Sequence, residues 1–202
     1  MRATVVLYDG CTITEVAEIA TRLANWDVQV EFAAATTQEL RDQSGLRMLP
    51  DRALAEIDPT GLTAVLVPGG DPASVLADDA VLGWLRRASE AGAIVAAICA
   101  GVTVVAAAGL TAGRRITHNH RSPWASPEHS QTVEHLWADA RIEPDRTIGV
   151  VRDANLITAL PNFPVEFAME VLVAIGLYDR RRASLMGAHL KGGYVEELYV
   201  GS

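Results

Sequence analysis

The chain has 202 residues and a mass of 21.6 kDa, which is the size of one domain with a short tail. Half of its residues are hydrophobic and 21% are charged, a composition that excludes disorder for most of the chain. The formal net charge of −8 argues against nucleic acid as a partner, because phosphate binding needs a basic face. The basic cluster at 180–182 is expected to be a solvated helix end.

In chain order, a strand is expected at 3–8. A helix should follow, starting at the capping-box pattern of residues 12–15 and running to about Asn25. The next elements are a strand, an excursion with short extended pieces, an apolar strand and a helix, at 28–34, 45–57, 63–67 and 79–91. This alternation predicts a mostly parallel sheet covered by helices on both faces.

The second half continues with a strand at 94–98 and a helix at 101–108 that Gly109 should terminate. A loop is expected at 118–127 and a short helix at 132–137. Two antiparallel edge strands are expected at 147–151 and 156–159, joined by a turn at 153–155. A helix at 164–175 should begin with Pro164 in its first turn and end before Gly176.

The domain is expected to span residues 1–178, and residues 179–202 should form a tail with a short helix, as part of that domain or as a contact segment. The start of the chain shows no signal-peptide pattern, so we expect a cytoplasmic protein with reduced thiols. Residues 91–113 carry no charge and are long enough to cross a bilayer. They are rich in alanine and glycine, which insert poorly, so a buried strand and helix are expected there, with no membrane contact.

The strongest chemical signal surrounds one of the two cysteines, Cys99. Cys99 stands between a predicted buried strand and a helix, with the small residues Ala97 and Gly101 two positions away on either side. This is the layout of a nucleophile elbow, a sharp turn that presents the central side chain. The start of the helix should also favour the thiolate. The plain alternative is a structural cysteine buried in an alanine-rich core.

Gly69 and Gly70 follow the apolar strand at 63–67, at the same end of the expected sheet as Cys99. Ligands collect at the carboxyl ends of parallel strands, so Gly69 is a candidate for the substrate pocket. The backbone amides of Gly70 and Ala100 are candidates for an oxyanion hole. An ordinary glycine turn explains the pair of glycines equally well.

Glu15 has two interpretations. It is the expected partner of Thr12 in a capping box. Alternatively, its carboxyl group points toward the strand ends, hydrogen-bonds Cys99 and moves protons as a general acid or base. The second role requires a partly protonated carboxyl group, which burial produces.

Together these residues resemble the ThiJ/PfpI family over roughly residues 3–176. Further anchors of the resemblance are Tyr8-Asp9-Gly10, Met48-Leu49-Pro50-Asp51 with Leu54, Val65-Leu66-Val67-Pro68, Gly109-Leu110 with Thr117-His118, Leu156-Ile157-Thr158 and Glu166-Phe167-Ala168. The resemblance implies a flavodoxin-like doubly wound α/β fold and a homodimer. It also implies that Glu15 pairs with Cys99, and that Gly70 and Ala100 supply oxyanion N–H groups.

Some positions depart from the family pattern. The peptidase-like branch has a histidine directly after the cysteine, where this chain has Ala100. His135 is a candidate third catalytic residue, and equally a surface histidine on a short helix. His118 and His120 are candidates for the substrate pocket, and no third ligand completes a metal site with them. A glutaminase is disfavoured because residues 162–166 lack the histidine that such enzymes need.

The leading hypothesis is a small-molecule enzyme with Cys99 as the nucleophile and no cofactor. The resemblance implies glyoxalase, deglycase or isocyanide hydratase chemistry on a small electrophilic substrate. The alternative is a protein without enzymatic activity, either a cysteine-based sensor of oxidative stress or a ligand-binding protein.

Overall fold

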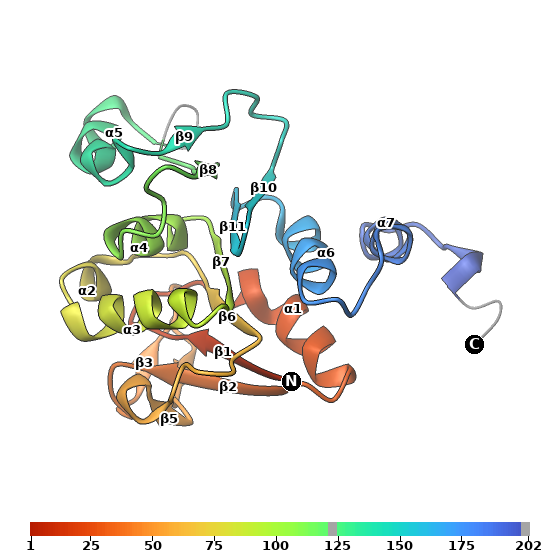
Figure 1. The fold of residues 1–202 in the computed structure, drawn as a ribbon, viewed down its shortest axis with the longest axis horizontal. Helices are drawn as coiled ribbons and strands as arrows, with labels where there is room; N and C mark the ends of the chain where they lie inside the picture. Colours follow the sequence, from red (N-terminus) through yellow and green to blue (C-terminus); the bar gives the residue numbers. More distant parts are fainter. Residues whose placement is uncertain (121–124, 199–202) are drawn as a thin grey trace.

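A computed structural model describes all residues except 121–124 and 199–202. Its centre is a seven-stranded sheet in the order β10-β11-β7-β6-β1-β2-β5 (Figure 1). The strands are β1 (Arg2–Val6), β2 (Gln29–Ala34), β5 (Arg52–Ala53), β6 (Ala64–Val67), β7 (Ile94–Ile98), β10 (Val150–Asp153) and β11 (Leu156–Ala159). Neighbouring strands are parallel except for the antiparallel pair β10–β11. The mostly parallel, flavodoxin-like sheet is therefore confirmed.

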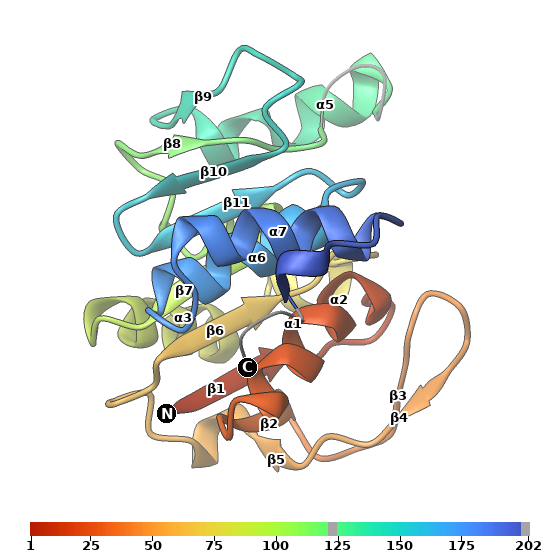
Figure 2. The ribbon, with the colours of Figure 1, turned by 90° about the vertical axis from the view of Figure 1, so that its right-hand side faces the viewer.

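Helices cover both faces of this sheet (Figures 1 and 2). Helices α1 (Thr14–Asn25) and α6 (Pro164–Ala174) pack against each other on one face. The other face carries α2 (Ala73–Leu76), α3 (Asp79–Glu90) and α4 (Gly101–Ala107). Strand β6 and residues 95–98 of β7 are buried throughout because they are covered on both sides, which explains their continuous apolar sequence.

Two helix ends follow the predicted signals. Pro164 occupies the first turn of α6, and Gly176 takes a positive φ of +79° just beyond the helix. Gly109 likewise has a φ of +76° after α4. A third signal was not predicted: Asp78 caps α3, with its side chain accepting from the backbone N–H groups of Ala80 and Val81.

The short helix expected in the tail is α7 (Arg180–Leu190), which lies against α6. The side chain of Asp179 accepts from the Arg182 N–H at 2.7 Å and caps the helix. Arg182, from the basic cluster, lies over the rings of Trp26 and Tyr178, with its guanidinium carbon 5.1 and 5.0 Å from their centroids. This cation–π contact joins the last long helix to the end of α1.

The region beyond α4 differs in detail from the prediction. The helix expected at 132–137 begins earlier, as α5 (Pro127–Val133) followed by a 3₁₀ turn, Glu134–Trp137. The edge strand expected at 147–151 begins at Val150 instead, because Asp145 binds both the N–H and the hydroxyl of Thr147 in a tight turn. Four residues of the loop expected at 118–127 lie outside the described residues.

Among the short elements, β4 (Arg47–Met48) and β5 are the extended pieces expected in the excursion at 45–57. The other short elements were not predicted. Strands β3 (Leu40–Arg41) and β4 pair as a hairpin, which projects from the body in Figure 2. Strands β8 (Arg115–Ile116) and β9 (Arg141–Ile142) form a separate parallel pair. Two further 3₁₀ turns are Leu54–Glu56 and Glu196–Leu198.

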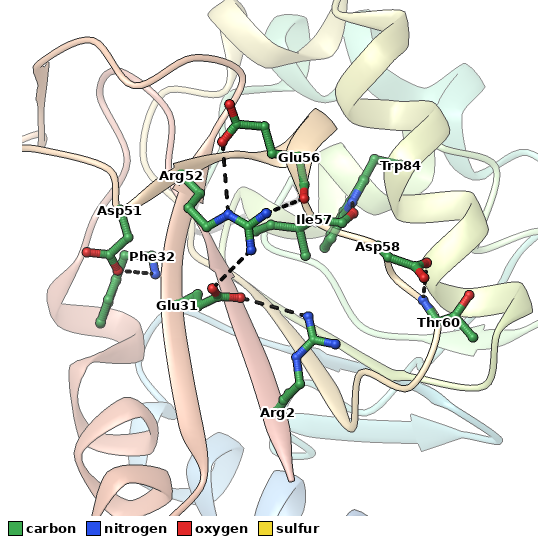
Figure 3. A network of polar contacts seen from close by, with 10 residues as sticks. All are labelled: Arg2, Glu31, Phe32, Asp51, Arg52, Glu56, Ile57, Asp58, Thr60 and Trp84. Carbon is green, nitrogen blue, oxygen red and sulfur yellow. Dashed lines mark hydrogen bonds and ion pairs between the residues drawn. The ribbon is translucent and has the colours of Figure 1, made fainter.

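Polar contacts fasten the edge of the sheet at β5 (Figure 3). Arg52 lies 3.4 Å from the Glu31 carboxylate and donates to the backbone carbonyl of Glu56. The buried Trp84 of α3 donates from its ring nitrogen to the carbonyl of Ile57 at 2.8 Å. The excursion at 45–57 is thereby attached both to β2 and to α3. Within the described residues, no helix is long and apolar enough to cross a membrane, and residues 91–113 contain β7 and α4.

Candidate active site

The candidate site lies at the carboxyl ends of β1, β6 and β7, three adjacent strands in the centre of the sheet. Glu15 follows β1, Gly69 and Gly70 follow β6, and Cys99 follows β7. The chain leaves β1 toward β2 on one side and β6 toward β7 on the other. Such a reversal leaves room at the strand ends, where ligands bind in open α/β sheets.

The turn at Cys99 has the geometry of a nucleophile elbow. Cys99 has a φ of +57°, a left-handed conformation that few residues other than glycine adopt. A Cβ atom on Gly101 would lie 2.4 Å from the Val67 carbonyl oxygen, and one on Gly69 would lie 2.5 Å from the Cys99 Cβ. The close approach of strand, turn and helix therefore requires glycine at both positions, and the strained backbone holds the thiol at the strand ends.

Glu15 is fixed by the turn after β6 and not by its own helix. The Gly69 N–H donates to Glu15 Oε2 at 2.7 Å. The capping-box prediction is wrong: α1 begins at Thr14, its N-cap is Ile13 without a side-chain hydrogen bond, and the Thr12 hydroxyl donates to Gln43 Oε1 at 2.9 Å. The carboxyl group of Glu15 is consequently free to meet the Cys99 side chain, with which it shares a hydrogen bond.

The backbone N–H groups of Gly70 and Ala100 hydrogen-bond the Cys99 sulfur. Gly70 has a φ of +108°, and a Cβ there would lie 2.2 Å from the Gly10 carbonyl oxygen, so only glycine fits at this position of the turn. The Tyr8 hydroxyl, buried beneath this turn, lies 2.7 Å from the Pro68 carbonyl oxygen and 2.8 Å from that of Gly69. Tyr8 thus positions the turn, a role that was not predicted.

The electrostatics of the site are dominated by burial. Burial and the neighbouring Glu15 carboxylate raise the pKa of the Cys99 thiol to about 12, although the Ala100 and Gly70 amides lower it. Burial also raises the pKa of Glu15, against the hydrogen bonds from Gly69 and Cys99 that lower it. In the resting pair, burial and Glu15 thus act against the thiolate that the start of the helix was expected to favour.

A cavity of about 410 Å³ opens over the Cys99 thiol. It is lined by Thr12, Glu15, Gln43, Gly70, Cys99, Ala100, Asn119, His120, Ala125 and Pro161. Gln43 was missed because it lies in the turn between β3 and β4, a hairpin that was not predicted. Asn119 lies in the loop expected at 118–127, but no role was predicted for it. For Asn119 the sequence carried a signal, its place between the two candidate histidines.

The three candidate histidines have different surroundings. His120 lines the cavity, with its ring Nε2 2.7 Å from the Thr103 hydroxyl. His118 was expected in the pocket but is 5% exposed and stacks on Trp137 with 4.4 Å between ring centroids, so it supports the wall from behind. His135 lies exposed on the 3₁₀ turn before Trp137 and away from the cavity, which makes it a surface histidine.

The second cysteine, Cys11, is fully buried below the site, and burial raises the pKa of its thiol to about 11. Its backbone bridges to Gly70. Within the described residues, no three His, Cys, Asp or Glu side chains are grouped to hold a metal ion.

Comparison with known proteins gives relatives along most of the chain. A family model described as the DJ-1/PfpI family matches residues 1–174. Protein dj-1beta of Drosophila melanogaster is 29% identical over 173 residues, which are 84% of this chain and 86% of that protein. Among solved structures, a ThiJ/PfpI family protein from Bacillus anthracis has a TM-score of 0.82 at 25% identity, covering 98% of this chain and 93% of that one.

Two curated relatives carry names of activities. The glutathione-independent glyoxalase DJR-1.2 of Caenorhabditis elegans is 34% identical over 97 residues, 48% of this chain and 52% of that protein, so the match spans about half of the glyoxalase. The isonitrile hydratase of Pseudomonas putida is 28% identical over 152 residues, 72% of this chain and 60% of that protein.

Proposed function

The chain belongs to the DJ-1/PfpI family, and from that premise we propose that it is an enzyme in which Cys99 attacks an electrophilic carbon of a small molecule. An α-oxoaldehyde is the substrate class that we favour. The nematode relative named a glyoxalase supports this choice, because its match reaches 34% identity. The relative named isonitrile hydratase makes isocyanides the second class to test.

The observation that carries the proposal is the pairing of Cys99 with Glu15. The thiol stands on a strained elbow with a φ of +57° and hydrogen-bonds a carboxyl group that the Gly69 amide fixes at 2.7 Å. A nucleophile whose base is oriented by a third group is the arrangement that covalent catalysis needs. A buried cysteine of the core needs neither the strain nor the carboxyl group.

In the proposed reaction, the sulfur bonds to the aldehyde carbon, and the electron pair of the C=O double bond moves to the oxygen. The thiol proton passes to Glu15, and the Gly70 and Ala100 amides stabilise the oxyanion. The oxygen then takes up a proton to give a hemithioacetal. Glu15 suits both transfers because its pKa is raised toward neutral pH, so that the carboxyl group can both accept and release a proton.

The remaining steps need water and no external oxidant or reductant. Loss of the proton from the former aldehyde carbon gives an enediol, and protonation of the neighbouring carbon gives a thioester of a 2-hydroxy acid. Water then cleaves the thioester and releases the acid and the thiol. The net change adds one water molecule to the substrate. The aldehyde carbon is oxidised to a carboxyl carbon while the neighbouring carbonyl carbon is reduced to an alcohol, so no cofactor is required.

The sensor hypothesis fits the site less well. Peroxide reacts with thiolates, and burial together with Glu15 favours the thiol form of Cys99. An enzyme avoids this difficulty because the base removes the proton as the substrate is attacked.

We also propose a homodimer, with the interface on the outer face of α1 and β2. A shallow apolar cavity of about 400 Å³ on this face is lined by Ile13, Ala17, Ala20, Thr21, Ala24, Val30 and Phe32. The sequence alone led us to expect an interface at the first strand and helix, near Cys11 and Glu15. The apolar face contains that helix, but Cys11 is fully buried in the chain and does not reach it.

The deciding experiment is a panel of glyoxal, methylglyoxal and small isocyanides offered to the wild type, Cys99→Ser and Cys11→Ser. We expect the wild type and Cys11→Ser to convert a dicarbonyl to its 2-hydroxy acid, and Cys99→Ser to fall to the uncatalysed rate. Cys11→Ser is the matched control because it removes the other thiol. Turnover that survives in Cys99→Ser would contradict the proposal.

A further inference from the structure

Asn119 faces the nucleophile from the segment that follows β8. Its side-chain nitrogen Nδ2 lies 3.7 Å from the Cys99 sulfur, within hydrogen-bond distance for sulfur, and the residue lines the cavity over that thiol. Glu15 also contacts this sulfur, but as a hydrogen-bond acceptor from the thiol. Asn119 offers the opposite polarity, an N–H donor.

Within the described residues, the hydrogen bond that this carboxamide makes is the one to the Cys99 sulfur. Oδ1 of Asn119 is buried, and no hydrogen-bond partner reaches it anywhere in the part of the chain that the structure describes. A buried polar atom without a partner costs stability, so a residue that served the fold alone would be better replaced by an apolar one. The side chain is better explained by its contact with sulfur.

The neighbours of Asn119 hold it in place, and its own side chain is not needed for this. The Thr117 N–H donates to the Thr158 hydroxyl of β11 at 2.9 Å, and the His120 ring binds the Thr103 hydroxyl of α4 at 2.7 Å. His118 stacks on Trp137. The residues on both sides are thus attached to the sheet, to α4 and to the 3₁₀ turn, and Asn119 is presented between them.

We propose that Asn119 is a further residue of the catalytic set, whose side-chain N–H stabilises the Cys99 thiolate as the thiol proton moves to Glu15. The Gly70 and Ala100 amides act on the same sulfur. Asn119 differs from them because it is a side chain that substitution can change. The role in turnover rests on the proposed function, whereas the effect on the thiol does not.

The test measures alkylation of Cys99 by iodoacetamide at pH 8, in a Cys11→Ser background so that one thiol remains. Below the thiol pKa, the rate is proportional to the thiolate fraction. Loss of a hydrogen bond to a charged group should therefore lower the rate in Asn119→Leu by about tenfold. Asn119→Asp, of the same size, places a carboxylate beside the sulfur and should lower the rate further.

A structural role would not produce this pattern. Asn119→Leu removes a buried oxygen that has no hydrogen-bond partner among the described residues, so its melting temperature should equal or exceed that of the parent. The matched control is Gln131→Leu, which removes an exposed carboxamide of α5 that does not line the cavity and should leave the alkylation rate within about twofold. If Leu packs poorly at residue 119, the Asp variant still tests the charge effect.

Unchanged alkylation in either Asn119 variant would overturn the inference, and so would an equal loss in Gln131→Leu. Failure of the proposed function is a separate result: no substrate of the panel would be converted, while the alkylation rates would still follow the identity of residue 119.

Discussion

Glu15 holds the pKa of the Cys99 thiol above its usual range, and the same carboxyl group is the nearest acceptor for the thiol proton. The two effects oppose each other in the resting protein and cooperate in a reaction. An anionic carboxylate disfavours a second negative charge on the sulfur, but it takes up the proton when the sulfur bonds to carbon.

Glu15→Gln should therefore separate thiol ionisation from turnover. A neutral amide removes the charge that raises the thiol pKa, so the pKa should fall and alkylation at pH 8 should become faster. Turnover should nevertheless fall by about 10²-fold or more, because the amide cannot carry the proton. Alkylation and kcat are measured on the same preparation. An unchanged kcat would reduce Glu15 to a structural residue that holds Gly69.

The two thiols should differ strongly in reactivity. Cys11 is fully buried and Cys99 is partly exposed in the cavity, so iodoacetamide at pH 6 should label Cys99 much faster. Mass spectrometry of peptides after timed labelling measures both rates. Equal rates would show that the cavity does not admit the reagent or that the core opens readily.

Raised thiol pKa values also predict how stability depends on pH. Burial raises the pKa of Cys11 to about 11, so this thiol stays protonated in the folded chain at a pH where it ionises in the unfolded chain. Its contribution to stability is complete below the ordinary thiol pKa and is lost as the pH rises toward 11. The melting temperature should fall less steeply between pH 9 and 11 in Cys11→Ser than in the wild type. Parallel curves would contradict the raised pKa.

Two glycine-to-alanine changes should have opposite effects on stability. A Cβ on Gly101 would lie 2.4 Å from a backbone oxygen, so Gly101→Ala should destabilise the fold by about 1–3 kcal/mol and distort the elbow. Gly83 lies within α3, where a new Cβ would meet side-chain nitrogens at 3.6 Å, so Gly83→Ala should stabilise by about 0.5–1 kcal/mol. Urea unfolding of both variants checks the signs. Equal effects would mean that the contact with Val67 is relieved at no cost.

The proposed dimer should be sensitive to charge on the outer face of α1. Light scattering at micromolar concentration should give a mass near twice 21.6 kDa. Ala17→Glu places a carboxylate in the apolar cavity of that face and should give monomers, whereas Ala112→Glu, at an exposed alanine elsewhere, should not. A monomeric wild type would contradict the proposal.

The sequence was informative wherever local spacing decides the structure. The small residues around Cys99 predicted the elbow, because strand and helix approach each other there without any distant contact. Pro164 and Gly176 likewise marked the ends of α6. Continuous apolar runs identified the central strands, because both faces of those strands are covered.

Distant contacts explain what the sequence concealed. Thr12 and Glu15 match a capping box, but Gln43 and Gly69, which are remote in sequence, bind their side chains instead. Asn119 lies in the expected loop after β8, and only the folded chain shows that this loop brings it to the sulfur. His118 and His120 are two residues apart, yet only the tertiary packing shows that His120 lines the cavity and that His118 packs on Trp137 behind it.

The Tyr8 hydroxyl fixes which polar groups of the turn after β6 face the cavity. It engages the carbonyl oxygens of Pro68 and Gly69, and the Thr12 N–H also binds the latter, while the N–H groups of Gly69 and Gly70 are left for Glu15 and the sulfur. Burial raises the pKa of Tyr8 far above its ordinary value, so the hydroxyl stays protonated and can donate well above neutral pH. The turn after β6 therefore presents donors toward the cavity under acidic and alkaline conditions alike. This scaffold therefore keeps its polarity while groups around the cavity or on the substrate change their protonation state.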